Sequence, residues 1–526
     1  MNKIMKLFFF MCVLSAAQNV RANNIIVSNV GLVGKDTSAG LNNPANFGFV
    51  KFDISWENSW RTSSAPNNWD AAWVFLKYRI GTGVWKHATL HTSSSTAPAG
   101  STITPSSDGK GVFLYRSADG SGNVNYSGAK LRWDYSTDGV LDADQVTVKV
   151  LAIEMVYVPQ GSYYLGTNGS EAGSFTDGSW RSGNSNSFQI TSEAALTIDA
   201  LNSSTLWSVD ATTIGPPGTL PANFPKGYNA FYCMKYSISQ RQYVDFLNTL
   251  TYDQQTSRTA VPPNSILGTP ALYLPPDQVS NRNGIKIQAA GISNTTPATY
   301  GCDLSGDGIY NQSDDGQYIE CNWLSWADGI AYSDWSGLRP MSEMEFEKAC
   351  RGTDAPVLND FAWNNAWATE ALGIANAGTI SETVLPDAAN CNFTRNYGFD
   401  VGGPVRVGNF ARSSSTRQQA GATYYGIMEM SGGVWERAVT VGNSAGRLFT
   451  GSHGDGALDA NGNAFGVSDW PDTSAAGAGF RGGVWDSPAT LLFVSDRTVA
   501  AFTSSVRGGN SNVFGTRGFR AVRTAQ

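Results

Sequence analysis

Histidine and cysteine are scarce in this 526-residue sequence, which holds 3 histidines and 6 cysteines. His87 and His91 lie far along the chain from His453, so we do not expect a metal site built from several imidazoles. His87 and His91 could share a strand face and bind zinc, but polar residues on a strand face are the commoner case. No Ser/His/Asp set and no phosphate-binding glycine loop stands out either. The sequence therefore gives no clear sign of a catalytic triad or of nucleotide-dependent chemistry.

Long apolar runs are also missing. A membrane-spanning helix needs roughly 20 apolar residues, and the strongest run, within MNKIMKLFFFMCVLSAAQNVRA, is about half that length. Lys3 and Lys6 precede the run and a small residue stands at a plausible cleavage point after Ala22, which is typical of a signal peptide over residues 1–22. We therefore predict no transmembrane segment and a secreted or cell-surface protein.

Positive charge is in short supply. The 36 basic residues fall to 33 once Lys3, Lys6 and Arg21 leave with the signal peptide, against 43 acidic residues. A net acidic chain rich in glycine and aromatic residues lacks the basic footprint of a nucleic-acid-binding protein. We expect no nucleic-acid partner.

Five cysteines remain in the mature chain. In an oxidising compartment they could form at most two disulfides, with one left over. Spacing alone does not fix the pairing, but Cys302 and Cys321 bracket one loop and are the preferred pair. The other three are Cys233, Cys350 and Cys391.

Residues 23–153 alternate between apolar and polar side chains. In FVKFDISWENSW, Val50, Phe52, Ile54 and Trp56 share one face, as a half-buried strand requires. WVFLKYRIGTGVW and VTVKVLAI repeat the pattern, and glycine-rich turns separate them. The length of the mature chain also indicates two or more domains, because it exceeds what one ordinary core accommodates. We predict an all-β sandwich domain over this range.

Helix signals begin after residue 153. SQRQYVDFLNTL and SEMEFEKACRG each open with a capping box, at Ser239 and at Ser342, and then place apolar residues on one helical face. Short helices among many loops and short strands predict an α+β domain over residues 154–526. The polar stretch 166–224 is predicted to be a loop-rich insertion without a core of its own.

The acidic loop DLSGDGIYNQSD, which begins at Asp303, has the spacing of a calcium-binding loop. Oxygen donors fall at positions one, three, five, nine and twelve, a backbone carbonyl falls at seven, and Gly308 stands at the sharp turn. The alternative is an acidic turn that holds no ion. The predicted calcium ligands are Asp303, Ser305, Asp307, the Ile309 carbonyl, Asn311 and Asp314.

Six blocks of the sequence carry a family resemblance. They are MVYVPQGSYYLG, YCMKYSISQRQYVDFLN, NWLSWADGIAYSDWSGLRPMSEMEFEKACRG, YYGIMEMSGGVWERAV, GFRGGVW and RGFRAVR. In order and approximate spacing they resemble the formylglycine-generating enzyme family, also called the sulfatase-modifying factor domain, from about residue 154 to the end. The resemblance implies a C-type-lectin-like α+β fold with little regular secondary structure, held together by buried tryptophans and bound calcium.

The resemblance also implies two calcium sites, because in the family the block matching EMSGGVWE wraps the ion with side chains on both sides of the turn and carbonyls within it. This chain departs from the family pattern at Gly433, where Asn is usual, and at Glu429, where Asn or Asp is usual. The alternative is that these carboxylates are solvated turn residues. Carried over, the ligands are Glu429, the Gly432 and Val434 carbonyls and Glu436 in the first site, and Asn390, the Cys391 carbonyl and Asp400 in the second.

The residues that the family uses for oxidation are missing. The resemblance implies two copper-binding cysteines shortly after an Arg-Gly-Gly-Ser block, but RGGVWDSPATLLFVSDR contains no cysteine and none follows Cys391. A second branch of the family holds non-haem iron with histidines, and His453 alone cannot supply a two-histidine triad. The sequence therefore favours a protein without catalysis.

The C-terminal segment from Gly479 to Arg523 keeps an arginine and glycine framework with aromatic and small polar residues between. Such a mixture is typical of adaptable recognition surfaces. The segment also resembles the variable region of lectin-fold proteins that are diversified by retroelements. The alternative is that these side chains complete the core. The predicted ligand-binding residues are Trp485, Thr490, Leu492, Phe493, Asn510, Asn512 and Phe514.

The interpretation that follows is an exported, non-catalytic protein that binds an unknown extracellular protein or glycan on a calcium-stabilised lectin-like domain. The β-sandwich would act as a spacer or anchoring module. One alternative is a non-haem metal oxidoreductase of the same family with a divergent active site. A second is a structural component of an extracellular assembly. Metal content and the effect of changes near Trp485 and Phe493 would divide these hypotheses.

Overall fold

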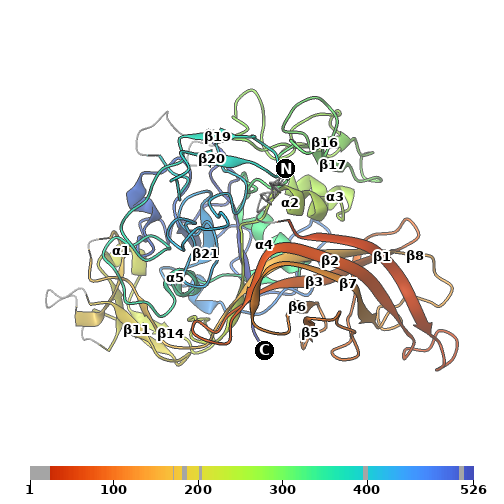
Figure 1. Cartoon of the computed structure of the whole chain (residues 1–526), viewed down its shortest axis with the longest axis horizontal. Coiled ribbons are helices and arrows are strands. Elements are labelled where there is room, and N and C mark those ends of the chain that lie inside the picture. The colour runs from red at the N-terminus through yellow and green to blue at the C-terminus, as the bar shows by residue number, and fades with distance from the viewer. Residues whose placement is uncertain (1–23, 170, 180–185, 201–203, 395–400, 509–513) are drawn as a thin grey trace, which may run out of the picture.

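The computed structural model describes residues 24–169, 171–179, 186–200, 204–394, 401–508 and 514–526 (Figure 1). Long N-terminal strands form one side of the molecule, and a loop-rich part with short helices forms the other. The predicted signal peptide lies outside the described residues. Within them, no helix is both long enough and apolar enough to cross a membrane.

The first part of the chain consists of strands in two layers. One layer has the order β1-β2-β7, and the other contains β8-β3-β6-β5 with β4 beside β3. The layers pack through a common apolar core that includes Val50 and Phe52 of β2, Val74 and Leu76 of β3, and Leu131 of β7. The strands are β1 (Ile26–Asp36), β2 (Phe47–Arg61), β3 (Asp70–Ile80), β4 (Lys86–His87), β5 (Ser101–Pro105), β6 (Val112–Arg116), β7 (Gly120–Trp133) and β8 (Val146–Val158).

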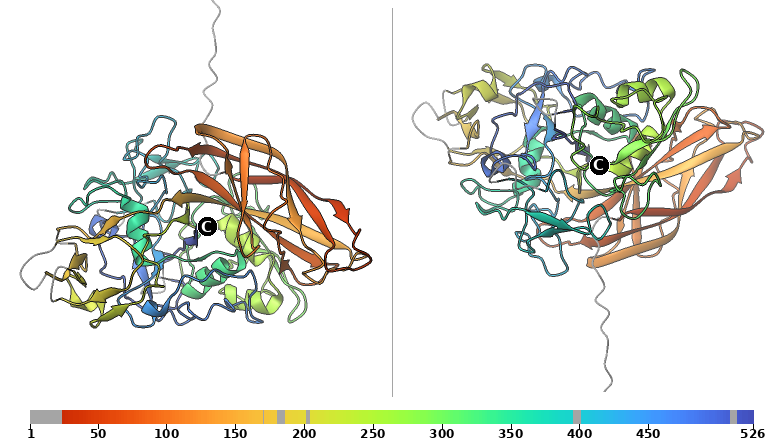
Figure 2. Two further views of the ribbon diagram at one scale, coloured as in Figure 1. Left: turned by 90° about the horizontal axis from the view of Figure 1, so that it is seen from below. Right: turned by 90° about the horizontal axis from the view of Figure 1, so that it is seen from above.

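One sheet runs through both halves of the chain. Beyond β8 it continues into β15 (Phe231–Met234), β23 (Ala521–Thr524) and β18 (Arg339–Pro340). The strand β8 makes this continuation because it pairs with β3 along its length and with β15 over its last residues. Seen from below and from above, the C-terminus, just after β23, lies between the N-terminal strands and the loop-rich part (Figure 2). The boundary predicted after residue 153 therefore falls inside a strand, and the predicted sandwich shares a sheet with the following domain.

The helices begin where their capping boxes predict. Ser239 caps α2 (Gln240–Leu247) and Ser342 caps α5 (Glu343–Arg351), each with the reciprocal side-chain bond of a capping box. The same device begins α3 (Tyr252–Arg258) and α4 (Trp326–Trp335). The other short helices are α1 (Ala211–Ile214), η2 (Gly446–Leu448) and η3 (Ala489–Leu492).

The stretch 166–224 is more ordered than a loop-rich insertion. Four of its strands form a sheet, β10-β13-β12-β14, and β11 pairs with β9. Phe175, Ile198 and Leu206 of the four-stranded sheet are buried in the main core. The strands around and within this stretch are β9 (Tyr163–Leu165), β10 (Phe175–Asp177), β11 (Phe188–Ile190), β12 (Leu196–Ile198), β13 (Leu206–Ser208) and β14 (Gly218–Leu220).

Short two-stranded sheets complete the fold, which is rich in strands and has few helices. They pair β16 with β17, β19 with β20, and β21 with β22. The strands are β16 (Ile285–Ala289), β17 (Thr299–Cys302), β19 (Gly373–Ala375), β20 (Thr383–Leu385), β21 (Glu436–Val439) and β22 (Ala478–Arg481). The turn before β21 carries the candidate calcium ligands.

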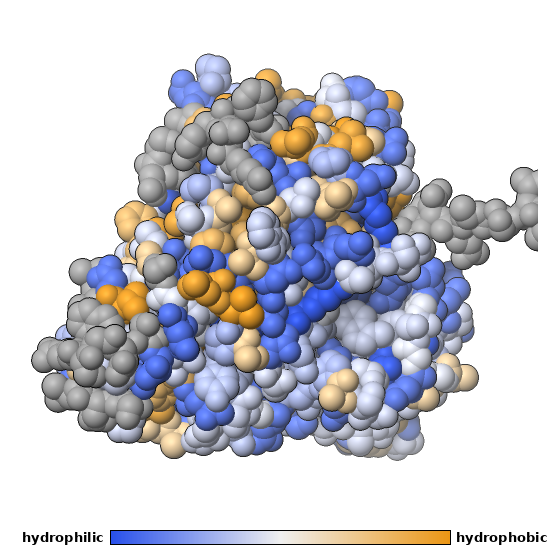
Figure 3. Space-filling model, turned by 60° about the vertical axis from the view of Figure 1, so that its left-hand side comes forward, coloured by the Kyte–Doolittle hydropathy of each residue, from blue (hydrophilic) through white to orange (hydrophobic). Residues whose placement is uncertain are grey.

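The side of the molecule that bears the four-stranded sheet is mainly hydrophilic. Among the coloured residues of this face, Figure 3 shows hydrophobic residues only in small, separated groups. The coloured residues of this face thus form no broad apolar patch.

Candidate functional site

Two predicted calcium ligands, Glu429 and Glu436, lie together with a third carboxylate that the sequence analysis missed, Glu320. All three are buried, with exposed fractions of 5%, 0% and 0% respectively. Gly433, in the turn between the two predicted ligands, has a φ of +79°, and a Cβ there would overlap the Glu320 carboxylate. The glycine at this position therefore lets the turn pack directly on Glu320.

Each of the three carboxylates is only half satisfied by hydrogen bonds. Glu436 Oε1 accepts from Arg520 Nε at 2.8 Å and from Ser237 Oγ at 3.1 Å, and Ser237 Oγ also lies 3.0 Å from Glu320 Oε1. Glu429 Oε1 accepts from the Gly408 amide at 2.6 Å. The Oε2 atoms of all three glutamates are buried and have no hydrogen-bond partner among the described residues. Buried carboxylate oxygens without partners are costly, so this cluster calls for a cation or for protons.

The pKa values of the cluster agree with that conclusion. Burial raises the pKa of Glu429 to about 7, with Arg520 and Arg406 opposing the shift. Burial and the charges of Glu429 and Glu436 raise the pKa of Glu320 well above its ordinary value. Burial also raises the pKa of Glu436, although Arg520 opposes it. The nearby arginines thus do not neutralise all three carboxylates, so the ionised cluster would carry a net negative charge.

The backbone of the turn also leaves the predicted carbonyl ligands open. The Gly433 carbonyl accepts from the Trp485 amide at 2.8 Å, and the Trp435 carbonyl accepts from the Gly518 amide at 3.1 Å. Among the described residues, no backbone or side-chain hydrogen bond uses the carbonyls of Gly432 or Val434. Every second carbonyl of the turn is thus hydrogen-bonded, and the two carbonyls between them, which the resemblance assigns to calcium, remain open.

The donor set therefore suits calcium in chemistry and charge, but its spacing is wider than a bound ion needs. In the described parts of the chain, no group of three or more His, Cys, Asp or Glu side chains stands close enough to hold a metal ion. Calcium would have to draw the Glu320, Glu429 and Glu436 side chains together around the turn. Calcium at this site stays a prediction.

The second predicted calcium site has its donors occupied by the chain itself. Asn390 Oδ1 accepts from the Thr369 amide at 2.8 Å, and the Cys391 carbonyl accepts from the Ala371 amide at 3.1 Å. Asp400 lies outside the described residues. These hydrogen bonds stabilise the loop and already use the two oxygen atoms that were predicted to bind calcium.

The acidic loop that begins at Asp303 closes differently from a calcium loop. Asp303 forms an ion pair with Lys286 at 2.9 Å, and Ser305 Oγ donates to Asp315 Oδ1 at 2.7 Å. The predicted ligand at position twelve, Asp314, is exposed, whereas the next residue, Asp315, is buried. The remaining predicted ligands serve the loop or face outward: Asn311 Oδ1 accepts from the Cys302 amide, Asp307 Oδ1 accepts from the Ile309 amide, and Ile309 is 60% exposed.

The predicted disulfide between Cys302 and Cys321 is not formed in the structure. Both thiols are free, and both are fully buried in the main apolar core. Cys302 ends β17, opposite Ile285 of β16, and packs there as a small hydrophobic residue.

The other three cysteines, Cys233, Cys350 and Cys391, are also free and buried. Burial raises the pKa of the Cys233 thiol to about 12 and raises that of Cys350 and Cys391 well above the ordinary value. A thiol of this kind holds its proton and is a poor nucleophile and a poor metal ligand.

The predicted ligand-binding surface is only partly at the surface. Trp485 and Leu492 are 3% and 0% exposed, so these two side chains belong to the core and not to a recognition surface. Thr490 is exposed, Phe493 is half-buried against Phe361, and Phe514 is 40% exposed. Asn510 and Asn512 lie outside the described residues.

The arginines of the same segment face inward because acidic residues of α5 and β21 receive them. Arg481 and Arg497 both bond Glu343, at 3.0 and 2.7 Å, and Arg520 bonds Glu436. The arginine framework thus completes the core, as the alternative interpretation of the segment held for these residues.

A hollow of about 460 Å³ lies beside β22 and collects residues from several parts of the C-terminal segment. Of the predicted ligand-binding residues that the structure describes, Phe514 lines it. The guanidinium groups of Arg437 and Arg517 lie 4.6 and 5.1 Å from the ring centre of Phe480 in its wall. The lining residues are Trp435, Phe480, Val484, Asp486, Ser487, Leu491, Val499, Phe502, Phe514, Thr516 and Arg517.

Trp435, Phe480 and Phe502 also line this hollow and were not predicted from the sequence. Trp435 stands inside the block SGGVWE, between the predicted calcium ligands, and Phe480 and Phe502 stand among the framework arginines. Their aromatic character was visible, but only the pairing of Trp435 with Arg517 and of β21 with β22 brings them to one place.

Comparison with known proteins agrees with the resemblance noted in the sequence. A family model described as the sulfatase-modifying factor enzyme 1-like domain matches residues 141–525, and so takes in β8 as well as the whole loop-rich part. No curated protein matches the chain. Since the family match covers well over half of the sequence, the protein belongs to the sulfatase-modifying factor family.

Proposed function

We propose that this protein is an exported ligand-binding member of the sulfatase-modifying factor family that lacks the family's oxidation chemistry. The observation that carries the proposal is the aromatic hollow beside β22, whose lining contains no thiol and no imidazole. Aromatic walls with a few polar groups are typical of a site that holds a ligand without reacting with it. The polar groups here are Asp486, Ser487, Thr516 and Arg517. The ligand would be an extracellular protein or a glycan.

The thiols of the chain support the non-catalytic part of the proposal. A copper site needs two thiolates that can approach one ion, but the five cysteines are buried with pKa values raised by burial. None of them lines the hollow. A reaction at this site would therefore have to proceed without cysteine.

Calcium would supply structure in this proposal. Glu429, Glu436 and the carbonyls of Gly432 and Val434 would hold the ion, and Glu320 would add a third carboxylate. The ion would neutralise charge beneath the turn that carries Trp435 into the hollow. We further propose that the domain is C-type-lectin-like and that the N-terminal sheets serve as a spacer or anchor.

Export is a separate part of the proposal. Removal of residues 1–22 would leave Ala22 as the last residue of the leader, and the mature chain would begin at Asn23. N-terminal sequencing of the protein recovered outside the cell tests this directly. A chain that keeps its first methionine in the cytoplasm would contradict it.

The binding test is a screen of the calcium-loaded, full mature chain against arrays of glycans and of extracellular peptides. Phe502 and Phe514 are 45% and 40% exposed, so Phe502→Ala with Phe514→Ala should leave stability within about 0.5 kcal/mol of the parent. We expect the double variant to lose at least about tenfold in affinity for any ligand of the hollow. Phe465→Ala, which removes a 59% exposed ring elsewhere, is the matched control and should bind normally.

The competing enzyme hypothesis is tested on the same preparations. The parent chain is incubated with copper or iron and a cysteine-containing sulfatase peptide, and the mass change of the peptide is measured by mass spectrometry. Conversion of the cysteine, lost in the Phe502→Ala and Phe514→Ala variant, would overturn the non-catalytic proposal. Equal ligand capture by the parent and the double variant would overturn the assignment of the hollow.

A further inference from the structure

The strand β8 has one edge that is only partly covered. The Tyr157 amide donates to the Trp69 carbonyl on the β3 side, whereas the Glu154 carbonyl accepts from the Lys235 amide on the β15 side. In an antiparallel pair, successive residues direct their amide and carbonyl groups to opposite edges. Odd-numbered residues of β8 thus bond β3, and even-numbered residues face the edge that β15 begins to cover.

The coverage by β15 ends early. β15 pairs with β8 from Met155 to Val158 only, and the Lys235 amide extends the pairing to Glu154. Among the described residues, the backbone amides and carbonyls of Val148, Val150 and Ala152 form no hydrogen bond on that edge. Three consecutive even-numbered residues therefore present an open row of donors and acceptors.

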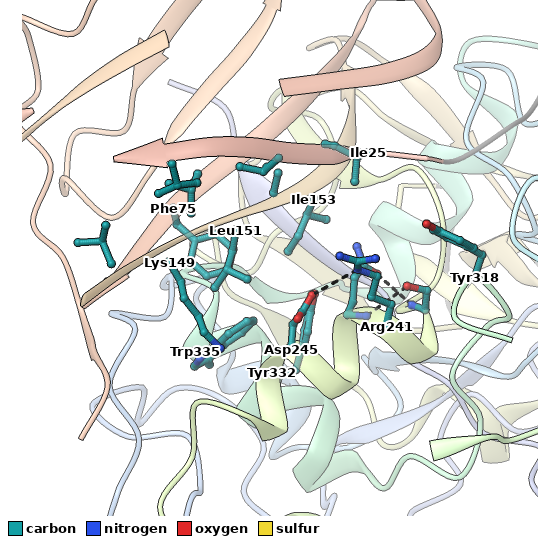
Figure 4. Close-up of a pocket in the computed structure, with 17 residues that line it drawn as sticks. Ile25, Phe75, Lys149, Leu151, Ile153, Arg241, Asp245, Tyr318, Tyr332 and Trp335 are labelled. Atoms are coloured by element: carbon teal, nitrogen blue, oxygen red, sulfur yellow. Dashed lines mark hydrogen bonds and ion pairs between the residues drawn. The ribbon is translucent and has the colours of Figure 1, made fainter. Parts of the chain in front are cut away.

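This open edge lies in a pocket of about 300 Å³ between the N-terminal strands and the helices (Figure 4). Six consecutive residues of β8, 148–153, line it, as expected when a strand edge and not one strand face borders a cavity. The other sides are β1 and the segment before it, with Ile25 and Val27, and α2, with Arg241 and Asp245. An accessible strand edge, with protein surface on both sides of it, can pair with one more strand.

We propose that the open edge of β8 binds an extended segment of a partner protein, which adds a strand to the eight-stranded sheet and carries alternating apolar and acidic side chains. The site is distinct from the aromatic hollow, since β8 and β1 contribute no residue to that hollow. Backbone hydrogen bonds to Val148, Val150 and Ala152 would give the affinity.

The two walls of the pocket define the side chains of the guest. Because neighbouring side chains of a strand point to opposite faces, one set would meet Ile25 and Val27 and the other would meet the side of α2. Burial raises the pKa of Asp245, and the charges of Arg241 and Lys149 oppose the shift, so both cations act on that one carboxylate. Two cations beside one anion leave a net positive wall, which fits acidic side chains.

The first experiment uses a synthetic peptide, acetyl-Thr-Val-Glu-Val-Glu-Val-Thr-amide, with the full mature chain. Residue-resolved amide exchange should show fast exchange at residues 148, 150 and 152 in the free protein and slow exchange at 149, 151 and 153, which β3 protects. Addition of the peptide should slow exchange at 148, 150 and 152 alone. The same peptide with alternate amides methylated should bind at least about tenfold more weakly, since it cannot complete the backbone bonds.

Two variants separate the edge from its charged wall. Ala152→Pro removes an amide that bonds neither β3 nor β15, so it should retain the fold and abolish peptide binding. Arg241→Glu changes a side chain that is 61% exposed and leaves the backbone unaltered, unlike the proline variant. It should weaken peptide binding at least about tenfold. Lys51→Glu, on the exposed face of β2, is the charge-matched control and should bind as the parent does.

Several results would overturn the proposal. Slow exchange at residues 148, 150 and 152 in the free protein would show that the edge is already covered. Equal binding of the methylated and unmethylated peptides would show that the backbone edge takes no part. Absence of any binding below about 1 mM would exclude a peptide of this pattern.

Discussion

Glu320, Glu429 and Glu436 concentrate more negative charge than the nearby arginines neutralise, and the consequence differs with the state of the site. In the absence of calcium, protons must supply the missing positive charge, because each carboxylate has a buried oxygen without a partner. With calcium bound, the same carboxylates can stay ionised and serve as ligands. The residues therefore link metal binding to pH.

The first prediction follows from the direction of the pKa shift at Glu429, which burial raises from 4.5 to about 7. A carboxyl group with a raised pKa in the folded state stabilises the fold fully below the unfolded pKa and loses that contribution as pH rises through the folded pKa. Without calcium, the free energy of unfolding should fall by about 3 kcal/mol between pH 4.5 and 7.5. Calcium should restore most of this loss at pH 7.5 and change little at pH 5.

Thermal unfolding with calcium and with a chelator, at both pH values, measures this effect. Glu429→Gln is the control, because a neutral amide at this position should remove much of the calcium effect and flatten the pH dependence of the chelated protein. Equal unfolding temperatures with calcium and with chelator at pH 7.5 would count against a calcium site at the turn.

At this scale the sequence was informative only where ligands are neighbours in the chain. Glu429 and Glu436 flank one turn, so a local pattern identified both. Glu320 is more than 100 residues away from them in the sequence. In the fold it pairs with Ser239 and reaches the cluster only through tertiary packing. Cys302 and Cys321 illustrate the reverse case, since they are near in sequence but are separate buried thiols.

At the scale of elements, one buried lysine ties three strands together. Lys235, just after β15, lies 3.1 Å from Glu154 of β8 and 3.4 Å from Asp70 of β3, and all three side chains are buried. Asp70 also accepts from the Trp56 indole of β2 at 2.9 Å. The group thus connects both N-terminal layers with the sulfatase-modifying factor domain.

The second prediction is that Lys235→Met strongly destabilises the protein. Removal of the ammonium group leaves Glu154 and Asp70 buried without their cation, so the free energy of unfolding should fall by about 3–5 kcal/mol at pH 7.5. Burial raises the pKa of Glu154 to about 7, so the loss should be smaller at pH 5, where Glu154 takes up a proton. Chemical denaturation at the two pH values measures both effects.

Two controls accompany this variant. Lys51→Met removes an exposed lysine of β2 and should change stability by less than about 0.5 kcal/mol. Adding Glu154→Gln to Lys235→Met should recover part of the lost stability, because the amide needs no counter-ion. An unchanged stability in Lys235→Met would show that the cluster does not connect the strands.

The elements themselves were predictable where their signals are local. The capping boxes at Ser239 and Ser342 act within four residues, and the alternation in β2 reflects burial of one strand face. The sheet that joins β8 to β15 and β23 was not predictable, because strands distant in sequence pair by hydrogen bonds that leave no local pattern. The strands within 166–224 were also missed, since each is only three residues long.

At the scale of the whole molecule, the two predicted domains share a core as well as a sheet. Trp73 and Phe75 of β3 belong to the same apolar cluster as Tyr232 of β15 and Trp335 of α4. The Trp73 indole donates to the Ser336 carbonyl at 2.8 Å, and the Arg523 guanidinium lies 4.6 Å from the Trp73 ring centre. Residues from near both ends of the chain thus stabilise one another.

The last prediction is that the full mature chain unfolds as one unit. Calorimetry should give a single transition whose calorimetric and van't Hoff enthalpies agree, because neither half can keep its core when the other unfolds. Trp73→Ala should lower the free energy of unfolding by about 3–5 kcal/mol and leave one transition, since its ring serves both halves. Separate production of residues 24–140 and 141–526 should give chains without cooperative unfolding, because the cut removes β8 from its pairing with β3. Two resolved transitions in the intact chain, with only one of them shifted by Trp73→Ala, would show instead that the N-terminal sheets are an independent domain.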